Sequence, residues 1–140
     1  MSRTMNLPDT PQALTLRPAL WAGRMMSALV VIALAADGAI QVFAPGAIAS
    51  TLQETGFAMD STRIVGPIIL ISALLYAIPA TTAFGAILVT GFLGGAICAH
   101  VRIGELGSAP EIVSLLLGAM TWGGLYLRDR RFRALLPLVR

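Results

Sequence analysis

The chain has 140 residues, 56% of them hydrophobic and 12% charged, and its mean hydropathy of +0.81 excludes a soluble domain of this size. All of its basic residues are arginines and most lie near the chain ends, so the net charge of +3 does not indicate a nucleic-acid-binding face. The single cysteine, Cys98, excludes an internal disulfide, a CxxC redox pair and a thiolate metal cluster.

The N-terminal segment, residues 1–18, is rich in Pro, Thr and Arg and is predicted to be a flexible cytosolic tail. An apolar run over about residues 20–42 follows, which is long enough to cross a bilayer as a helix. Trp21 and Arg24 suit interface anchors at its start. The Ala-Ile-Ala at residues 47–49 fits a signal-peptide cleavage site, but the apolar run is too long and starts too late to favour cleavage.

A short amphipathic helix is predicted after this first span, at about residues 47–56. Ile48 and Leu52 lie one helical turn apart, and polar residues occupy the other faces. Gly56 is suited to end the helix. Such an element is expected to lie in the membrane interface.

Two further spanning helices are predicted over residues 61–78 and 80–99. Pro79 ends the first of them and leaves room only for a tight turn, so the two helices must be antiparallel neighbours. A fourth spanning helix is predicted over residues 110–127, with Glu111 favourably placed at its positive end. The membrane domain therefore covers residues 19–128.

An arginine-rich C-terminal tail, residues 129–140, completes the chain. With four spans, most arginines fall on the side of the two termini, and only Arg63 and Arg102 fall on the other side. This asymmetry predicts that both termini are cytoplasmic. Four aromatic residues are expected to form a belt at that inner interface: Trp21, Tyr76, Trp122 and Tyr126.

Small residues repeat at i+4 along the third predicted helix: Thr82, Ala86, Thr90, Gly94 and Cys98. Gly91 and Gly95 add a GxxxG spacing, which favours close contact between helices in membranes. The predicted partners are Gly118, Gly123 and Gly124 on the fourth helix. Packing within one chain is the favoured interpretation, and a homodimer interface is the alternative.

Five polar residues are predicted to meet at the outer end of the spanning helices: Asp37, Gln41, Arg63, His100 and Arg102. A carboxylate within a spanning segment is unfavourable and is usually paired or functional. We therefore predict that Asp37 pairs with Arg102 or His100. The favoured interpretation is a structural ion pair among ordinary loop charges, and the alternative is a site for a ligand, a proton or a quinone head group. No metal-ligand spacing and no catalytic set of residues is present in the sequence.

The stretch from Leu74 to Gly104 resembles the DoxX-like family of small four-helix bacterial membrane proteins, and the resemblance covers most of the chain beyond Pro18. The matching motifs are Leu-Tyr-x-Ile-Pro (75–79), Gly-Ala-x-Leu-x-Thr-Gly (85–91), Leu-Gly-Gly-Ala (93–96), His-Val-Arg-Ile-Gly (100–104) and Trp-Gly-Gly-Leu-x-Leu-Arg-Asp (122–129). Asp37 matches an aspartate usual in the first helix of the family. Two positions depart from it: many relatives have a glutamate where this chain has Ile69 and an arginine where it has Ala80.

The resemblance implies an all-α protein of four transmembrane helices in the bacterial inner (plasma) membrane. Some family members associate with redox complexes, and most have no assigned activity. The leading hypothesis is a non-catalytic accessory membrane subunit with redox or quinone partners, needing no cofactor of its own. The alternatives are a small proton-coupled transporter or exporter that uses Asp37, and a structural homodimer.

Overall fold

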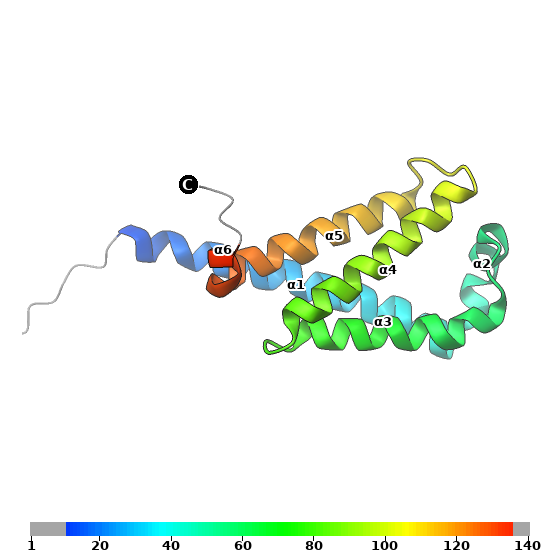
Figure 1. Cartoon of the computed structure of the whole chain (residues 1–140), viewed down its shortest axis with the longest axis horizontal. Helices are drawn as coiled ribbons and strands as arrows, with labels where there is room; N and C mark the ends of the chain where they lie inside the picture. Colours follow the sequence, from blue (N-terminus) through cyan, green and yellow to red (C-terminus); the bar gives the residue numbers. More distant parts are fainter. Residues whose placement is uncertain (1–10, 136–140) are drawn as a thin grey trace, which may run out of the picture.

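The computed structural model describes residues 11–135, and every regular element in this range is helical. Four long helices dominate Figure 1. They are α1 (Pro11–Phe43), α3 (Thr62–Ala77), α4 (Thr82–Arg102) and α5 (Ala109–Arg128). The short elements η1 (Pro45–Ile48), α2 (Ala49–Thr55) and η2 (Met59–Ser61) connect α1 to α3, and α6 (Arg130–Leu135) follows α5. The predicted all-α class is confirmed.

Three of the helical segments are long and apolar enough to cross a membrane, namely Pro18–Phe43, Met59–Ala77 and Thr82–Arg102. Helix α5 is of comparable length, but it is less apolar. Its first turn holds Pro110 and Glu111, and its second half holds Trp122, Tyr126 and several glycines. The sequence therefore supports three spans directly, and the fourth depends on how α5 packs.

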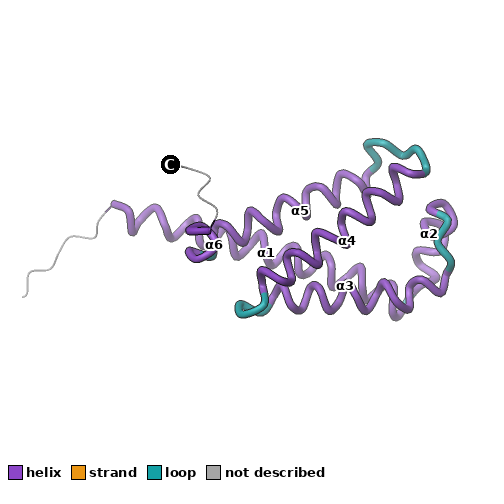
Figure 2. Tube along the Cα trace, viewed as in Figure 1, coloured by secondary structure: helices purple, strands orange, loops and turns teal. Residues whose placement is uncertain are grey.

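The four long helices pack in a closed order in which α1 and α4 each contact both α3 and α5. Consecutive long helices run in opposite directions, and the loops of Figure 2 lie at their ends. The turn after Pro79 joins α3 and α4 as an antiparallel pair, as predicted. Helix α2 ends at Gly56 in the left-handed conformation (φ 72°), which agrees with the predicted glycine cap.

The predicted N-terminal tail differs from the structure. Helix α1 begins at Pro11, so residues 11–18 of the predicted tail are helical, while residues 1–10 lie outside the described range. Pro18 is accommodated within this helix. At the other end, α6 occupies part of the predicted C-terminal tail, and residues 136–140 lie outside the described range.

Glycines bring the helices together at places that the sequence pattern did not indicate. A Cβ on Gly38 of α1 would approach Leu70 of α3 to 2.9 Å, and a Cβ on Gly66 of α3 would approach Gln41 Cβ to 3.1 Å. A Cβ on Gly85 of α4 would collide with the backbone of Tyr76. The close helix crossings therefore depend on these glycines, because any side chain there would separate the helices.

The predicted packing row on α4 is only half correct. Thr82 and Ala86 are buried, but Thr90, Gly94 and Cys98 are exposed. A Cβ added at Gly91, Gly94 or Gly95 would meet no atom within 4 Å, so these glycines do not pack against another helix of this chain. In this part of α4 the side chains buried in the core are Val89 and Leu93, which lie on a different face from the glycine row.

Of the predicted partners of that row, Gly118 faces α4, where a Cβ would lie 3.9 Å from Leu93 Cδ1, but the other two pack elsewhere. A Cβ on Gly124 of α5 would lie 2.7 Å from Ser27 Oγ, and a Cβ on Gly123 would lie 3.1 Å from Met26 Cε, both on α1. These glycines therefore serve the crossing of α5 over α1. Association of two copies through the exposed part of the α4 row stays a prediction.

Helices α3 and α4 diverge from their connecting turn, so the pair has a narrow end and a wide end (Figure 1). The buried apolar residues concentrate toward the narrow end: Val30, Leu34, Ile69, Ala73, Tyr76, Ala86, Val89, Leu93 and Leu125. Toward the wide end the buried side chains are polar: Gln41, Thr55, Thr62, His100 and Ser114. The apolar core thus fills the narrow end of the molecule, and buried polar side chains lie toward the wide end.

Candidate functional site

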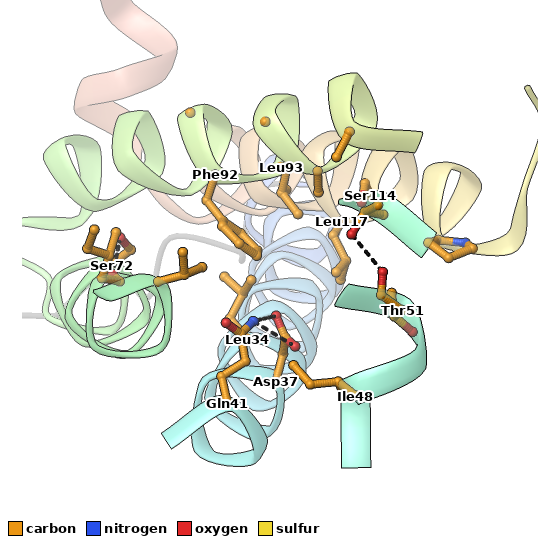
Figure 3. A pocket seen from close by; sticks show the side chains of 18 of the residues that line it. Leu34, Asp37, Gln41, Ile48, Thr51, Ser72, Phe92, Leu93, Ser114 and Leu117 are labelled. Carbon is orange, nitrogen blue, oxygen red and sulfur yellow. Dashed lines mark hydrogen bonds between the residues drawn. The ribbon is translucent and has the colours of Figure 1, made fainter. Parts of the chain in front are cut away.

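A cavity of about 870 Å³ lies between the diverging α3 and α4, and α1, α2 and α5 complete its wall (Figure 3). Most of the wall is apolar, with Leu34, Phe92 and Leu117 directed into the space. Ile68 of α3 and Ile87 of α4 also line it and are 49% and 59% exposed. The cavity is therefore open at its side, along the faces that a spanning protein turns to lipid.

The polar part of the wall begins on α1. Asp37 and Gln41 lie one turn apart, so both side chains face the cavity (Figure 3). The Gln41 amide nitrogen donates to both carboxylate oxygens of Asp37 at 3.3 Å, which is long for a hydrogen bond. Asp37 is partly buried and Gln41 is buried. This contact orients the carboxylate without neutralising it.

His100 reaches the same cavity from the last turn of α4. Its Nδ1 lies 2.8 Å from Oε2 of Glu105, five residues further along the chain. Gly104 makes this contact possible, because its φ of 84° turns the chain back toward the helix end. The carboxylate of Glu105 thus fixes the orientation of the imidazole.

Helix α2 lies at the wide end of the α3–α4 pair, and Ile48, Thr51 and Thr55 contribute to the cavity wall from that side (Figures 1 and 3). The guanidinium of Arg102 donates to the Thr55 carbonyl oxygen and so ties the end of α2 to the end of α4. An arginine is well suited to this role, because its planar donors satisfy carbonyls at a helix terminus.

The structure brings together three of the five predicted site residues, Asp37, Gln41 and His100, on one cavity. The predicted pairing of Asp37 with Arg102 or His100 is wrong for the described residues, since Arg102 bonds to Thr55 and His100 to Glu105. The physical reason is that both groups find closer partners near the end of their own helix.

Arg63 lies apart from this cavity. It forms an ion pair with Asp60 at 3.6 Å, and both side chains are 84% exposed. It borders a separate groove of about 330 Å³ between α1 and α3. An ion pair so exposed contributes little stability, so Arg63 is an ordinary surface charge.

A comparison with protein families matches residues 25–124 to the DoxX-like family, and this range covers most of the chain. The chain belongs to the DoxX-like family. Neither the comparison with curated proteins nor the comparison with solved structures gave a match. It is thus a DoxX-like membrane protein with several apolar helices.

The two departures from the DoxX-like pattern now have a structural setting. Ile69 is fully buried in the apolar core, so this chain has no carboxylate at that point of α3. Ala80 lies exposed in the turn between α3 and α4. A mechanism that needs a glutamate on α3 is therefore absent from this DoxX-like chain, and Asp37 is the carboxylate that lines the cavity.

Sequence reasoning missed a second polar cluster, which centres on Tyr76. The residue was assigned to an aromatic belt, but it is completely buried. Its hydroxyl donates to the Thr121 carbonyl oxygen at 2.8 Å and lies 3.0 Å from Ser27 Oγ. The Arg128 guanidinium stands 5.3 Å from the centre of the tyrosine ring.

Arg128 completes the cluster by donating to the Tyr76 carbonyl oxygen and to Thr82 Oγ1, each at 3.3 Å. We call Ser27, Tyr76, Thr82, Thr121 and Arg128 the tyrosine junction. It connects all four long helices at the narrow end, opposite the cavity. In the sequence, Tyr76 lies within the Leu-Tyr-x-Ile-Pro motif, three residues before the helix-ending Pro79.

The cavity also contains groups that the sequence did not single out, chiefly Thr51, Ser72 and Ser114. Gly91 and Gly95 line it too, so the two glycines of the GxxxG motif border the cavity and do not contact a neighbouring helix among the described residues. Among the described residues no three His, Cys, Asp or Glu side chains are grouped as a metal site would require. An apolar space with one polar end suits the binding of an amphiphilic molecule.

Proposed function

We propose that this DoxX-like chain spans the bacterial plasma membrane four times and holds a lipid-like molecule in the cavity between α3 and α4. In this proposal it is a non-catalytic accessory subunit, and the bound molecule reaches it from the bilayer. The observation that supports the proposal most directly is the cavity itself: apolar along its length, polar at one end, and open between two helices.

The packing of α5 supports the fourth span. Gly124 of α5 meets Gly23 of α1, and Trp122 donates to Thr90 Oγ1 of α4 at 2.9 Å. Helix α5 therefore lies against two helices that are apolar enough to span. With α5 crossing, the arginine asymmetry favours cytoplasmic termini.

The topology predicts opposite labelling of two engineered cysteines in a Cys98→Ser background. Leu106, in the loop before α5, is 76% exposed, and Arg131, after α5, is exposed as well. A membrane-impermeant maleimide is expected to label Leu106→Cys in intact cells, and Arg131→Cys only after the cells are opened. Labelling of both from the same side would show that α5 does not cross.

Entry of a lipid chain is supported by the half-exposed rim residues Ile68 and Ile87. A cavity of this volume lies within the range of about 300–1,000 Å³ typical of small-molecule sites. In a bilayer an apolar opening of this kind is filled by lipid chains or by a ligand that competes with them.

The cavity proposal is tested with Gly91→Leu, because a leucine there projects into the cavity. Gly94→Leu is the matched control: it lies three positions away, has equally open surroundings, and does not line the cavity. Two phospholipids with a diazirine in the acyl chain, phosphatidylethanolamine and phosphatidylglycerol, are each photo-crosslinked to the purified chain in vesicles.

At least one of the two phospholipids is expected to crosslink to cavity residues in the wild type and in Gly94→Leu. In Gly91→Leu this crosslinking should fall about tenfold, since displacing a buried apolar group removes about 1.5–3 kcal/mol. Equal crosslinking in all three proteins would contradict binding in the cavity.

The redox link and the carrier hypothesis both stay proposals. A decyl-tailed quinone added to the same experiment is expected to reduce crosslinking if quinones are the ligand class. Failure to do so, with no oxidoreductase co-purifying, would remove the redox link. A proton-coupled carrier would use Asp37, which is the carboxylate of the cavity wall.

A further inference from the structure

The polar end of the cavity wall holds a carboxyl group without a cationic partner among the described residues. The described lining includes Asp37 but no arginine, and the sequence contains no lysine. Among the described side chains, Arg63 forms an ion pair with Asp60, and His100 contacts Glu105 and is charged only when protonated. Neither contact involves Asp37. An ionised carboxylate accepts hydrogen bonds at about four lone-pair positions, and Gln41 supplies only one long, shared donor.

Three hydroxyl groups of the wall donate to backbone carbonyls and not to Asp37. Thr55 donates to the Thr51 carbonyl oxygen at 2.6 Å, Thr62 to the Met59 carbonyl at 2.8 Å, and Ser72 to the Ile68 carbonyl at 2.7 Å. These protons are therefore used within or beside their own helices. What these hydroxyls offer the cavity is their remaining acceptor lone pairs.

His100 adds a further acceptor. When its ring is neutral and Nδ1–H donates to the Glu105 carboxylate, Nε2 presents a lone pair. Arg102 cannot compensate the charge of Asp37 from its observed position, because it bonds to the Thr55 carbonyl and does not line the cavity. The polar end of the cavity thus presents several acceptors, and among the described residues no arginine lines it.

We infer that the molecule bound here is an amphiphile whose head is a protonated primary amine, held by the Asp37 carboxylate, and whose alkyl chain lies between α3 and α4. This rests on the proposed cavity binding and specifies the ligand class. An ammonium carries the charge that Asp37 lacks and the three donors that the surrounding acceptors can receive. In apolar surroundings such a pair is stronger than in water.

Other heads fit the same wall less well. A carboxylate or phosphate head would repel Asp37, and a quinone ring offers only acceptor oxygens. A hydroxyl head donates one hydrogen bond but brings no charge. Two sources share the favoured chemistry: the head group of an aminophospholipid and a free single-chain amine.

The test compares three single-chain ligands with the same tail, dodecylamine, dodecanol and dodecanoate. Each is titrated against the purified full chain in a non-ionic detergent, with the midpoint of thermal unfolding as the readout. The variants are Asp37→Asn, which keeps the shape but removes the charge, and Asp37→Glu, which keeps the charge. Glu54→Gln is the matched control, because Glu54 is an exposed carboxylate outside the cavity.

Wild type is expected to bind dodecylamine about 10- to 100-fold more tightly than dodecanol, as a hydrogen-bonded charge should. Dodecanoate should bind most weakly. Asp37→Asn should reduce amine affinity to that of the alcohol, Asp37→Glu should retain most of the preference, and Glu54→Gln should leave it unchanged. The ratio of amine to alcohol is measured within each variant, so a change in basal stability does not enter it.

Equal affinities for amine and alcohol in the wild type would overturn the inference, as would an amine preference that persists in Asp37→Asn. In either case, the binding of amine and alcohol to Gly91→Leu tests the proposed function separately. If neither ligand binds to this variant, binding in the cavity is still supported. If none of the three ligands binds, and phospholipid crosslinking is the same in Gly91→Leu as in the wild type, the inference and the proposed function are both contradicted.

The two sources are separated with the photoactivatable phospholipids. The aminophospholipid is the source if phosphatidylethanolamine crosslinks more strongly than phosphatidylglycerol and if excess dodecylamine removes this difference. Equal crosslinking of the two lipids, with tight binding of dodecylamine, identifies a single-chain amine.

Discussion

Gly85→Ala is expected to lower the free energy of unfolding by about 3 kcal/mol or more. An alanine Cβ at this position would lie 2.6 Å from the carbonyl carbon of Leu75 and would collide with the nitrogen and Cα of Tyr76. These atoms belong to the backbone of α3, which cannot rotate out of the way as a side chain can. The α3–α4 pair would have to separate at the point where it is most tightly packed.

The measurement is unfolding by sodium dodecyl sulfate in mixed micelles, followed by tryptophan fluorescence. Gly94→Ala is the matched control, because a methyl group there meets no atom within 4 Å. Its stability should be unchanged or raised by up to about 1 kcal/mol, as alanine favours helix over glycine. Equal stability of the two variants would contradict the close approach of α4 to α3.

Tyr76→Ala is expected to destabilise the chain by about 3–5 kcal/mol, the usual effect of truncating a large buried aromatic side chain. Tyr76→Phe separates the hydroxyl from the ring. It leaves the Thr121 carbonyl oxygen and Ser27 Oγ without the tyrosine hydroxyl, which should lower the free energy of unfolding by about 1–3 kcal/mol. The ring and its contact with Arg128 remain in that variant.

The same unfolding measurement applies to both substitutions. Tyr126→Phe is the control, since Tyr126 is only partly buried and the described residues include no hydrogen-bond partner for its hydroxyl. Its stability should stay within about 0.5 kcal/mol of the wild type. A Tyr76→Phe variant as stable as Tyr126→Phe would show that the tyrosine junction does not hold the four helices.

The sequence predicted the fold well where local chemistry decides it. Apolar runs of spanning length, Pro79 after α3 and Gly56 after α2 act within a few residues, and the structure agrees with each. The convergence of Asp37, Gln41 and His100 on one cavity also followed from topology alone, since the ends of antiparallel helices meet.

The helix contacts could not be predicted in the same way. The row from Thr82 to Cys98 is a genuine repeat, yet only Thr82 and Ala86 of it are buried, and further along α4 the buried side chains are Val89 and Leu93. The partners of Arg102 and His100 were missed for a related reason. Arg102 binds Thr55 and His100 binds Glu105, and both partners lie close to the end of α4. Spacing in the sequence does not show that these partners are nearer than Asp37.

The divergence of α3 and α4 gives the two ends of the molecule different packing. The apolar core and the tyrosine junction fasten the helices at the narrow end. At the wide end, the link from Arg102 to Thr55 fastens α2 to α4. The narrow end is thus held by contacts among all four long helices, whereas at the wide end α3 and α4 stand apart around the cavity.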